Sequence, residues 1–148
     1  MSRLSRPLVW RPLTGAAIGL LGLCSLAACS SGSSNKAPTS LSLSGQKVPV
    51  TQVTTGVSNL CVLLKTFKSD PTASRSTYFD GPYQPLHVLA AALQGTQSDD
   101  LLRAMEAYER DLLMTPAPAA TVTTGNALVA SAQSGLRSLN VKPPTCST

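Results

Sequence analysis

His87 is the only histidine among the 148 residues, so it is the first residue to consider for catalysis. As a general base, an imidazole needs a nucleophile beside it and an acid that orients it, and the sequence indicates neither. A metal site needs several ligands, and the chain contains no cluster of histidine and cysteine. We therefore predict a protein that is not an enzyme, with no catalytic residue, no metal site and no cofactor.

Asp99 and Asp100 are adjacent carboxylates, which raises the question of a paired acid and base. Neighbouring residues lie about 100° apart around a helix axis, so the two groups would point in different directions. The positive end of a helix dipole suits carboxylates better. We interpret the pair as a helix start.

Three aromatic residues, Tyr78, Phe79 and Tyr83, lie close together in the segment "STYFDGPY" (76–83). The run Asp80–Pro82 is typical of a turn, so the segment is predicted to be a loop. Two interpretations stay open. The loop could fold its aromatic rings onto the helices as a lid, or the three residues could form a contact patch for a partner protein or a glycan.

Cys29 ends an apolar run in "LGLCSLAACSSGSS" (21–34), where the sequence changes at once to serine and glycine. Three arginines with no acid among them precede the apolar segment 13–28. A basic head, an apolar middle and small residues at the end are the three parts of a secretory signal. The segment has 16 residues, fewer than the roughly 20 that a membrane-spanning helix needs. We therefore predict that residues 1–28 are a signal peptide.

The end of this signal is more specific. Leu26, Ala27, Ala28 and Cys29 resemble the lipobox of bacterial lipoproteins, in which a branched apolar residue and two small residues precede a cysteine. The resemblance covers the first 29 residues and concerns processing rather than fold. It implies that the Cys29 sulfur receives a diacylglyceryl group, that Cys29 becomes the mature N-terminus, and that two acyl chains hold the protein on the extracytoplasmic face of the cell membrane. The alternative is an ordinary signal peptide cut after Ala28, which would leave the protein untethered.

The part that follows the signal is nearly neutral. The whole chain has 12 basic and 7 acidic residues, but three arginines lie in the signal, so 9 basic and 7 acidic residues give the remainder a charge of +2. Nucleic-acid binding calls for a basic stripe, and no run of lysine and arginine follows Cys29. We therefore expect no nucleic-acid partner.

Residues 29–55 are rich in serine, threonine, glycine and proline and contain no aromatic residue. Such a composition cannot bury enough apolar surface to offset its ordering entropy. We predict a disordered tether between the lipid and a domain formed by 56–148. The alternative is that "VPVTQV" (48–53) pairs as a short strand.

Cys61 and Cys146 are the two cysteines of the predicted domain. Outside the cytosol an even pair of cysteines is expected to be oxidised, so we predict a disulfide that ties the first helix to the C-terminal tail. The alternative, a reactive thiol pair, lacks the Cys-x-x-Cys spacing that favours it.

Apolar residues recur at intervals of three and four in four segments of the domain, which predicts amphipathic helices. These segments run from Gly56 to just before Pro71, over 82–94, within 96–116 and within 121–140. Short connections between most of them indicate a small all-α bundle of about four helices with one disulfide.

The expected function follows from these features. We expect a membrane-anchored, non-enzymatic cell-envelope lipoprotein that acts as a binding or accessory module for a protein or an envelope polymer. The alternative is a small-molecule or lipid carrier with a pocket inside the bundle, lined by Leu86, Leu93, Met105 and Leu128.

Overall fold

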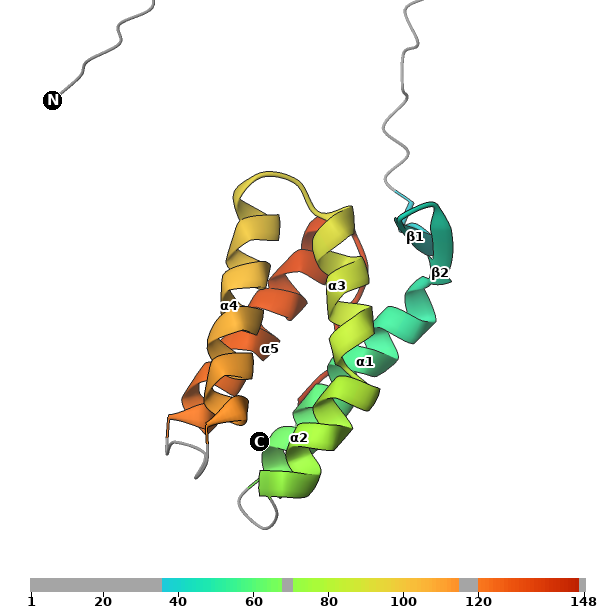
Figure 1. Cartoon of the computed structure of the whole chain (residues 1–148). Helices are drawn as coiled ribbons and strands as arrows, with labels where there is room; N and C mark the ends of the chain where they lie inside the picture. The colour runs from blue at the N-terminus through green and yellow to red at the C-terminus, as the bar shows by residue number, and fades with distance from the viewer. Residues whose placement is uncertain (1–35, 68–70, 115–119, 147–148) are drawn as a thin grey trace, which may run out of the picture. The chain divides into compact units, whose positions relative to one another are not determined.

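A computed structural model describes residues 36–67, 71–114 and 120–146 (Figure 1). These residues belong to one compact unit, Ser34–Thr148; the other unit, Met1–Ser33, lies outside the described residues, and with it the predicted signal peptide and Cys29. The elements, in chain order, are β1 (Ser40–Leu43), β2 (Gln46–Pro49), α1 (Val50–Thr66), α2 (Pro71–Asp80), α3 (Tyr83–Ala92), α4 (Thr96–Leu113) and α5 (Thr121–Ser138). The predicted helical bundle is confirmed, with five helices in the described residues and a two-stranded sheet beside them.

The core is built from the apolar stripes that the sequence indicates. Each long helix buries side chains three or four residues apart, which places them on one face. The innermost of them are Val53, Val57 and Leu60 of α1, Leu86 and Leu89 of α3, Leu101, Met105 and Tyr108 of α4, and Leu128, Ala132 and Leu136 of α5. They form one hydrophobic cluster. Helices α4 and α5 lie side by side in Figure 1.

Two glycines allow helices to approach closely. Gly56 of α1 is buried against Pro85 of α3, and a β-carbon on Gly56 would lie 2.7 Å from Cγ of that proline. Gly135 of α5 is buried in the same way against Leu93, where a β-carbon would lie 2.7 Å from Cδ1. Any larger residue at either position needs a neighbour to move.

The predicted tether is wrong over much of its length. Strands β1 and β2 form an antiparallel hairpin, in which Leu41 pairs with Val48. The turn places Ser44 at φ 50° and Gly45 at φ 83°, the left-handed conformations that tight hairpin turns require. Helix α1 then starts at Val50 rather than at Gly56, so the ordered domain begins before the predicted boundary.

Burial of one side chain explains why this hairpin is ordered. Leu41 is 6% exposed and belongs to the hydrophobic core, and β1 packs against α3. No loop separates the hairpin from α1, because β2 ends at Pro49 and α1 begins at Val50. The backbone N–H of Val50 also donates to the carbonyl oxygen of Thr39 (3.0 Å). The short alternation of apolar and polar residues is therefore sufficient to form a strand when α3 is present for its apolar side chain to pack against.

The segment predicted to be a loop is mostly helical. Pro71–Asp80 forms α2, with the proline at the first position, where its missing N–H costs little. Ser74 and Tyr78, four residues apart, are both buried. The turn predicted around Asp80–Pro82 is present as the short break between α2 and α3.

The C-terminal tail turns back along α5. Asn140 adopts a left-handed conformation (φ 58°). The N–H of Asn140 donates to the carbonyl of Arg137 and that of Val141 to the carbonyl of Leu136, both at 2.9 Å. This pair of hydrogen bonds is the Schellman motif that ends many helices. It directs the tail toward α1, where Cys146 meets Cys61.

Candidate functional site

A network of aromatic rings joins α2, α3 and α4. Its centre is Tyr78, which is fully buried and makes edge contacts with Tyr108 (5.1 Å between ring centroids), Phe79 (5.2 Å) and Tyr83 (6.0 Å). Edge-to-face pairs at such distances add to the stabilisation that burial gives. The network therefore starts in the core of the domain.

The network continues to the surface through Phe79, Tyr83 and His87, which we call the aromatic ledge. Phe79 and Tyr83 are 5.4 Å apart, and Tyr83 meets the imidazole of His87 at 4.5 Å. All three side chains are half-buried. Tyr83 and His87 are four residues apart on α3, so they share one face of that helix. The ledge is a solvent-accessible aromatic surface with a rigid base.

The two buried tyrosines differ in their hydrogen bonding. The hydroxyl of Tyr78 donates to Oε1 of Glu109 on α4 at 3.0 Å. The hydroxyl of Tyr108 is buried and has no hydrogen-bond partner among the described residues. Burial raises the pKa of both phenols far above the ordinary value of 10.0, and the Glu109 carboxylate raises that of Tyr78 further. Both phenols therefore stay protonated at neutral pH and act as polar parts of the core.

Sequence reasoning missed two acidic residues of α4, the half-buried Glu109 and the buried Asp111. Asp111 is 6% exposed; its Oδ2 accepts a hydrogen bond from Oγ1 of Thr124 (2.9 Å), and its Oδ1 lies 3.8 Å from Nε of Arg110. The carboxylate thus meets the first turn of α5, where the helix dipole favours negative charge. A signal for Glu109 was available, because it lies four residues after the buried Met105 and hence on the inward side of α4.

The residues considered for catalysis are dispersed. His87 contacts Tyr83, while Asp99 and Asp100 are exposed at the start of α4 and Asp100 lies 4.0 Å from Arg103. Within 36–67, 71–114 and 120–146, no three residues of the types His, Cys, Asp and Glu come together as metal ligands would. The described residues offer no constellation to which a reaction can be assigned.

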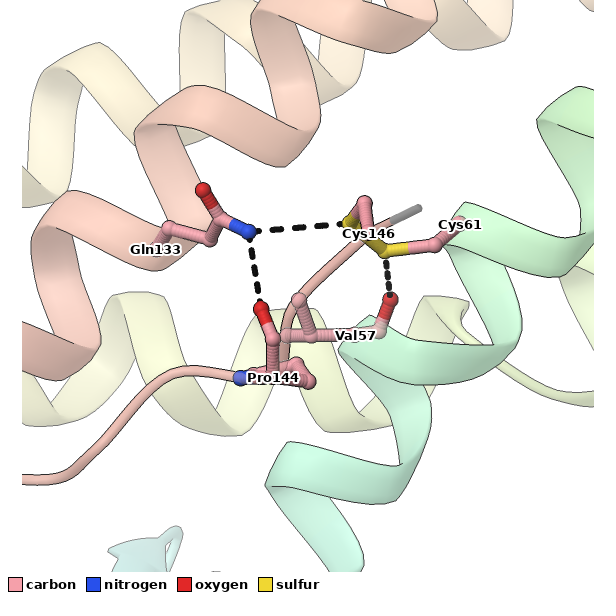
Figure 2. Close-up of a disulfide and its surroundings, with 5 residues drawn as sticks. All are labelled: Val57, Cys61, Gln133, Pro144 and Cys146. Carbon is pink, nitrogen blue, oxygen red and sulfur yellow. Dashed lines mark hydrogen bonds between the residues drawn. A yellow bond between two sulfur atoms is a disulfide. The ribbon is translucent and has the colours of Figure 1, made fainter. Parts of the chain in front are cut away.

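The predicted disulfide between Cys61 and Cys146 is confirmed (Figure 2). The two Cα atoms are 5.4 Å apart, and the bridge spans 85 residues of sequence. Gln133 of α5 supports the tail, since its Nε2 donates to the carbonyl oxygen of Pro144 (2.9 Å) and lies 3.6 Å from Sγ of Cys146. Sγ of Cys61 lies 3.1 Å from the carbonyl oxygen of Val57; a disulfide sulfur carries no proton, so we regard this as a close contact.

Of the two interpretations of the aromatic segment, the contact patch does not fit Tyr78. Its side chain is fully buried beneath the neighbouring rings, so it presents no surface to a partner in the folded chain. The contact interpretation stays a prediction for Phe79 and Tyr83, which reach the surface. The lid interpretation describes Tyr78 better, although the aromatic residues stand on helices instead of a loop.

The residues expected to line a carrier pocket are packed in the core. Leu86, Leu93, Met105 and Leu128 are at most 7% exposed and belong to the same hydrophobic cluster. Two surface cavities, of about 180 and 170 Å³, have other linings. The first is lined by Gln97, Asp100, Ser131, Ser134 and Gly135, and the second by Asn59, Val62, Leu63, Thr66, Thr77, Gly81 and Pro82. No observation on the described residues favours the carrier.

Comparison with known proteins yields no match to a family model, to a curated protein or to a solved structure. In the part of the chain that the structure describes, no helix is both long enough and apolar enough to cross a membrane.

Proposed function

We propose that this chain is a lipid-anchored, non-enzymatic binding module of the bacterial cell envelope, and that the aromatic ledge is its contact surface. The anchor rests on the resemblance of Leu26–Cys29 to a lipobox. The binding role rests on one observation: Phe79 and Tyr83 are half-buried aromatic residues in a domain that has few of them. The partner is a protein or an envelope polymer.

The chemistry of the ledge suits binding. Aromatic residues bury a large area at low cost in side-chain entropy, and they are enriched in the energetically important part of interfaces. The base of the ledge is already rigid, because Tyr78 holds Phe79 and Tyr83 from beneath through edge contacts. Little ordering is therefore left to be done when a partner binds.

The contact surface can be tested by photo-crosslinking in cells. A photoreactive benzoylphenylalanine replaces Phe79, and in a matched control it replaces Leu113, an apolar residue on α4 that is 50% exposed. We expect an adduct from position 79 that is missing from position 113 and that Tyr83→Ala weakens. Identical adducts from both positions, or none from position 79, would contradict the proposed contact surface.

The anchor needs its own test, with the other signal-segment cysteine as a control. Cys29→Ala should leave the protein uncleaved or released in membrane fractionation, because the acyl chains are attached to that sulfur. Cys24→Ala should behave as the unchanged chain, since the bulky Leu23 before Cys24 does not fit the lipobox pattern. Acylation that persists in Cys29→Ala would refute the anchor.

A further inference from the structure

The acidic residues of this chain are concentrated on one helix. Five of its seven acidic residues lie in α4: Asp99, Asp100, Glu106, Glu109 and Asp111. By contrast, helix α5 contains none, and neither do the four elements β1, β2, α1 and α3. These four elements pack on one another, α1 against α3 and β2, and β1 against α3. The hairpin and its supports thus form an acid-free region.

Two exposed lysines give the hairpin end of this region a positive charge. Lys47 lies on β2 and Lys36 lies shortly before β1, and both are exposed. No acidic residue occurs between Cys29 and Asp70 in the sequence. The electrostatic preference of the hairpin is therefore for anions, and a surface of anionic lipid attracts lysines close to it.

The hairpin is also the first element of the domain to follow the proposed anchor in the sequence. Lys36 follows Cys29 by seven residues. A chain spans at most about 3.6 Å per residue in any conformation, so the two Cα atoms are at most about 25 Å apart. Helix α1 then leads away from the hairpin over its 17 residues, a length of about 26 Å. Figure 1 shows α2 at the opposite end of α1 from the hairpin.

We infer that the hairpin, with Lys36 and Lys47, lies against the anionic lipid headgroups of the membrane that holds Cys29. This inference rests on the proposed lipid anchor. It gives the domain one orientation on the membrane: the hairpin is proximal, and the end formed by the start of α2 is distal.

The orientation can be measured with fluorophores at two matched sites. The labels are attached to cysteines introduced by Ser42→Cys on β1 and by Ser76→Cys on α2. Both serines are exposed, and both changes leave every lysine in place. The lipidated chain is placed in vesicles that contain phosphatidylglycerol and a headgroup-linked quencher. We expect the label at position 42 to be quenched several-fold more than the label at position 76. In vesicles of phosphatidylcholine alone, the difference should shrink.

The lysines themselves are tested by substitution. The double variant Lys36→Gln with Lys47→Gln should reduce the difference in quenching between the two labels on anionic vesicles. Lys65→Gln, an exposed lysine near the far end of α1, is the control and should leave the difference unchanged. Sodium chloride at high concentration should act as the double lysine variant does, because salt screens exposed charges.

Two outcomes would overturn the inference while the anchor stands, and a third would overturn both. Equal quenching of both labels on anionic vesicles, with Cys29 acylated by mass spectrometry, refutes the orientation alone. An effect of Lys65→Gln as large as that of the double variant refutes the role of the hairpin lysines. A mature chain without the diacylglyceryl mass on Cys29 overturns both the anchor and the orientation.

Discussion

The hydroxyl of Tyr78 on α2 donates a 3.0 Å hydrogen bond to Glu109 on α4, while the adjacent phenol of Tyr108 is buried without a partner among the described residues. The two rings are in edge contact at 5.1 Å. They therefore share one environment and differ mainly in whether the hydroxyl is satisfied. This contrast allows paired predictions in which the same chemical change has opposite effects.

Tyr78→Phe should lower the free energy of unfolding by about 1–3 kcal/mol, because it removes a donor to a charged acceptor that is partly shielded from water. Glu109→Gln keeps an acceptor oxygen and should cost less. Urea unfolding of the three chains, followed by circular dichroism, measures the differences. A Tyr78→Phe chain as stable as the unchanged one would show that the hydrogen bond contributes nothing net.

Tyr108→Phe should instead leave stability unchanged or raise it by about 1 kcal/mol, since a buried hydroxyl without a partner carries an uncompensated desolvation cost. The same urea experiment applies. A loss of more than about 1 kcal/mol would mean that the hydroxyl of Tyr108 does form a hydrogen bond in solution.

Stability should fall as the pH rises above about 10, the ordinary pKa of tyrosine. Burial raises the pKa of Tyr78 and of Tyr108 in the folded chain, so above pH 10 the unfolded chain loses protons that the folded chain keeps. Each phenol then lowers the free energy of unfolding by about 1.4 kcal/mol per pH unit until its folded pKa is reached. Urea unfolding at pH 8, 10 and 11 tests this slope, and Tyr78→Phe should make it shallower.

Loss of the disulfide should lower the free energy of unfolding by about 2–5 kcal/mol, because the bridge closes a long loop. Cys146→Ala is the cleaner single variant, since Cys146 is half-buried whereas Cys61 is in the core. The double variant should be only slightly less stable than Cys146→Ala. In the unchanged chain, a thiol reagent added under denaturing, non-reducing conditions should label neither cysteine; labelling of both would contradict the bridge.

Gly56→Ala should destabilise the domain more than Gly135→Ala, although alanine is the better helix former by about 1 kcal/mol at both sites. A methyl group at position 56 meets the ring of Pro85, which is rigid, whereas at position 135 it meets the end of the Leu93 side chain, which can rotate. Overpacking typically costs about 1–3 kcal/mol. Melting temperatures in the reverse order would show that the proline yields more easily than the leucine.

The helices with strong apolar periodicity could be predicted from the sequence, and the elements without it could not. Helix α4 buries Leu101, Met105 and Tyr108 as its spacing predicts. Helix α2 has no such stripe, because its one large buried side chain is Tyr78 and the rest of its described surface is mostly polar. Its helical state depends on tertiary contacts with α1, α3 and α4, which no local pattern contains.

The hairpin illustrates a second limit. The alternation of Leu41 and Leu43 with serine is a strand pattern, but it is short and surrounded by residues typical of disorder. The hairpin is stabilised by the burial of Leu41 of β1, and β1 packs against α3, a helix more than forty residues later in the chain. At the candidate site, the spacing of the aromatic residues in the sequence was sufficient to predict that they lie close together. It was insufficient to tell the buried Tyr78 from the half-buried Phe79 and Tyr83, because that depends on the position of α4.

The bond between Cys61 and Cys146 makes a covalent ring that encloses the last turn of α1 and all of α2 to α5. The hairpin and α1 from Val50 to Leu60 lie outside it. A mechanical load applied between the N-terminal side of the hairpin and the chain after Cys146 passes through the bridge, and it can therefore peel away the hairpin and the first turns of α1. The load cannot extend the ring, so the chain between Cys61 and Cys146, with a contour length of about 300 Å, does not lengthen under the load. The part of the domain that carries Phe79, Tyr83 and His87 is the part that the bridge protects from being drawn out.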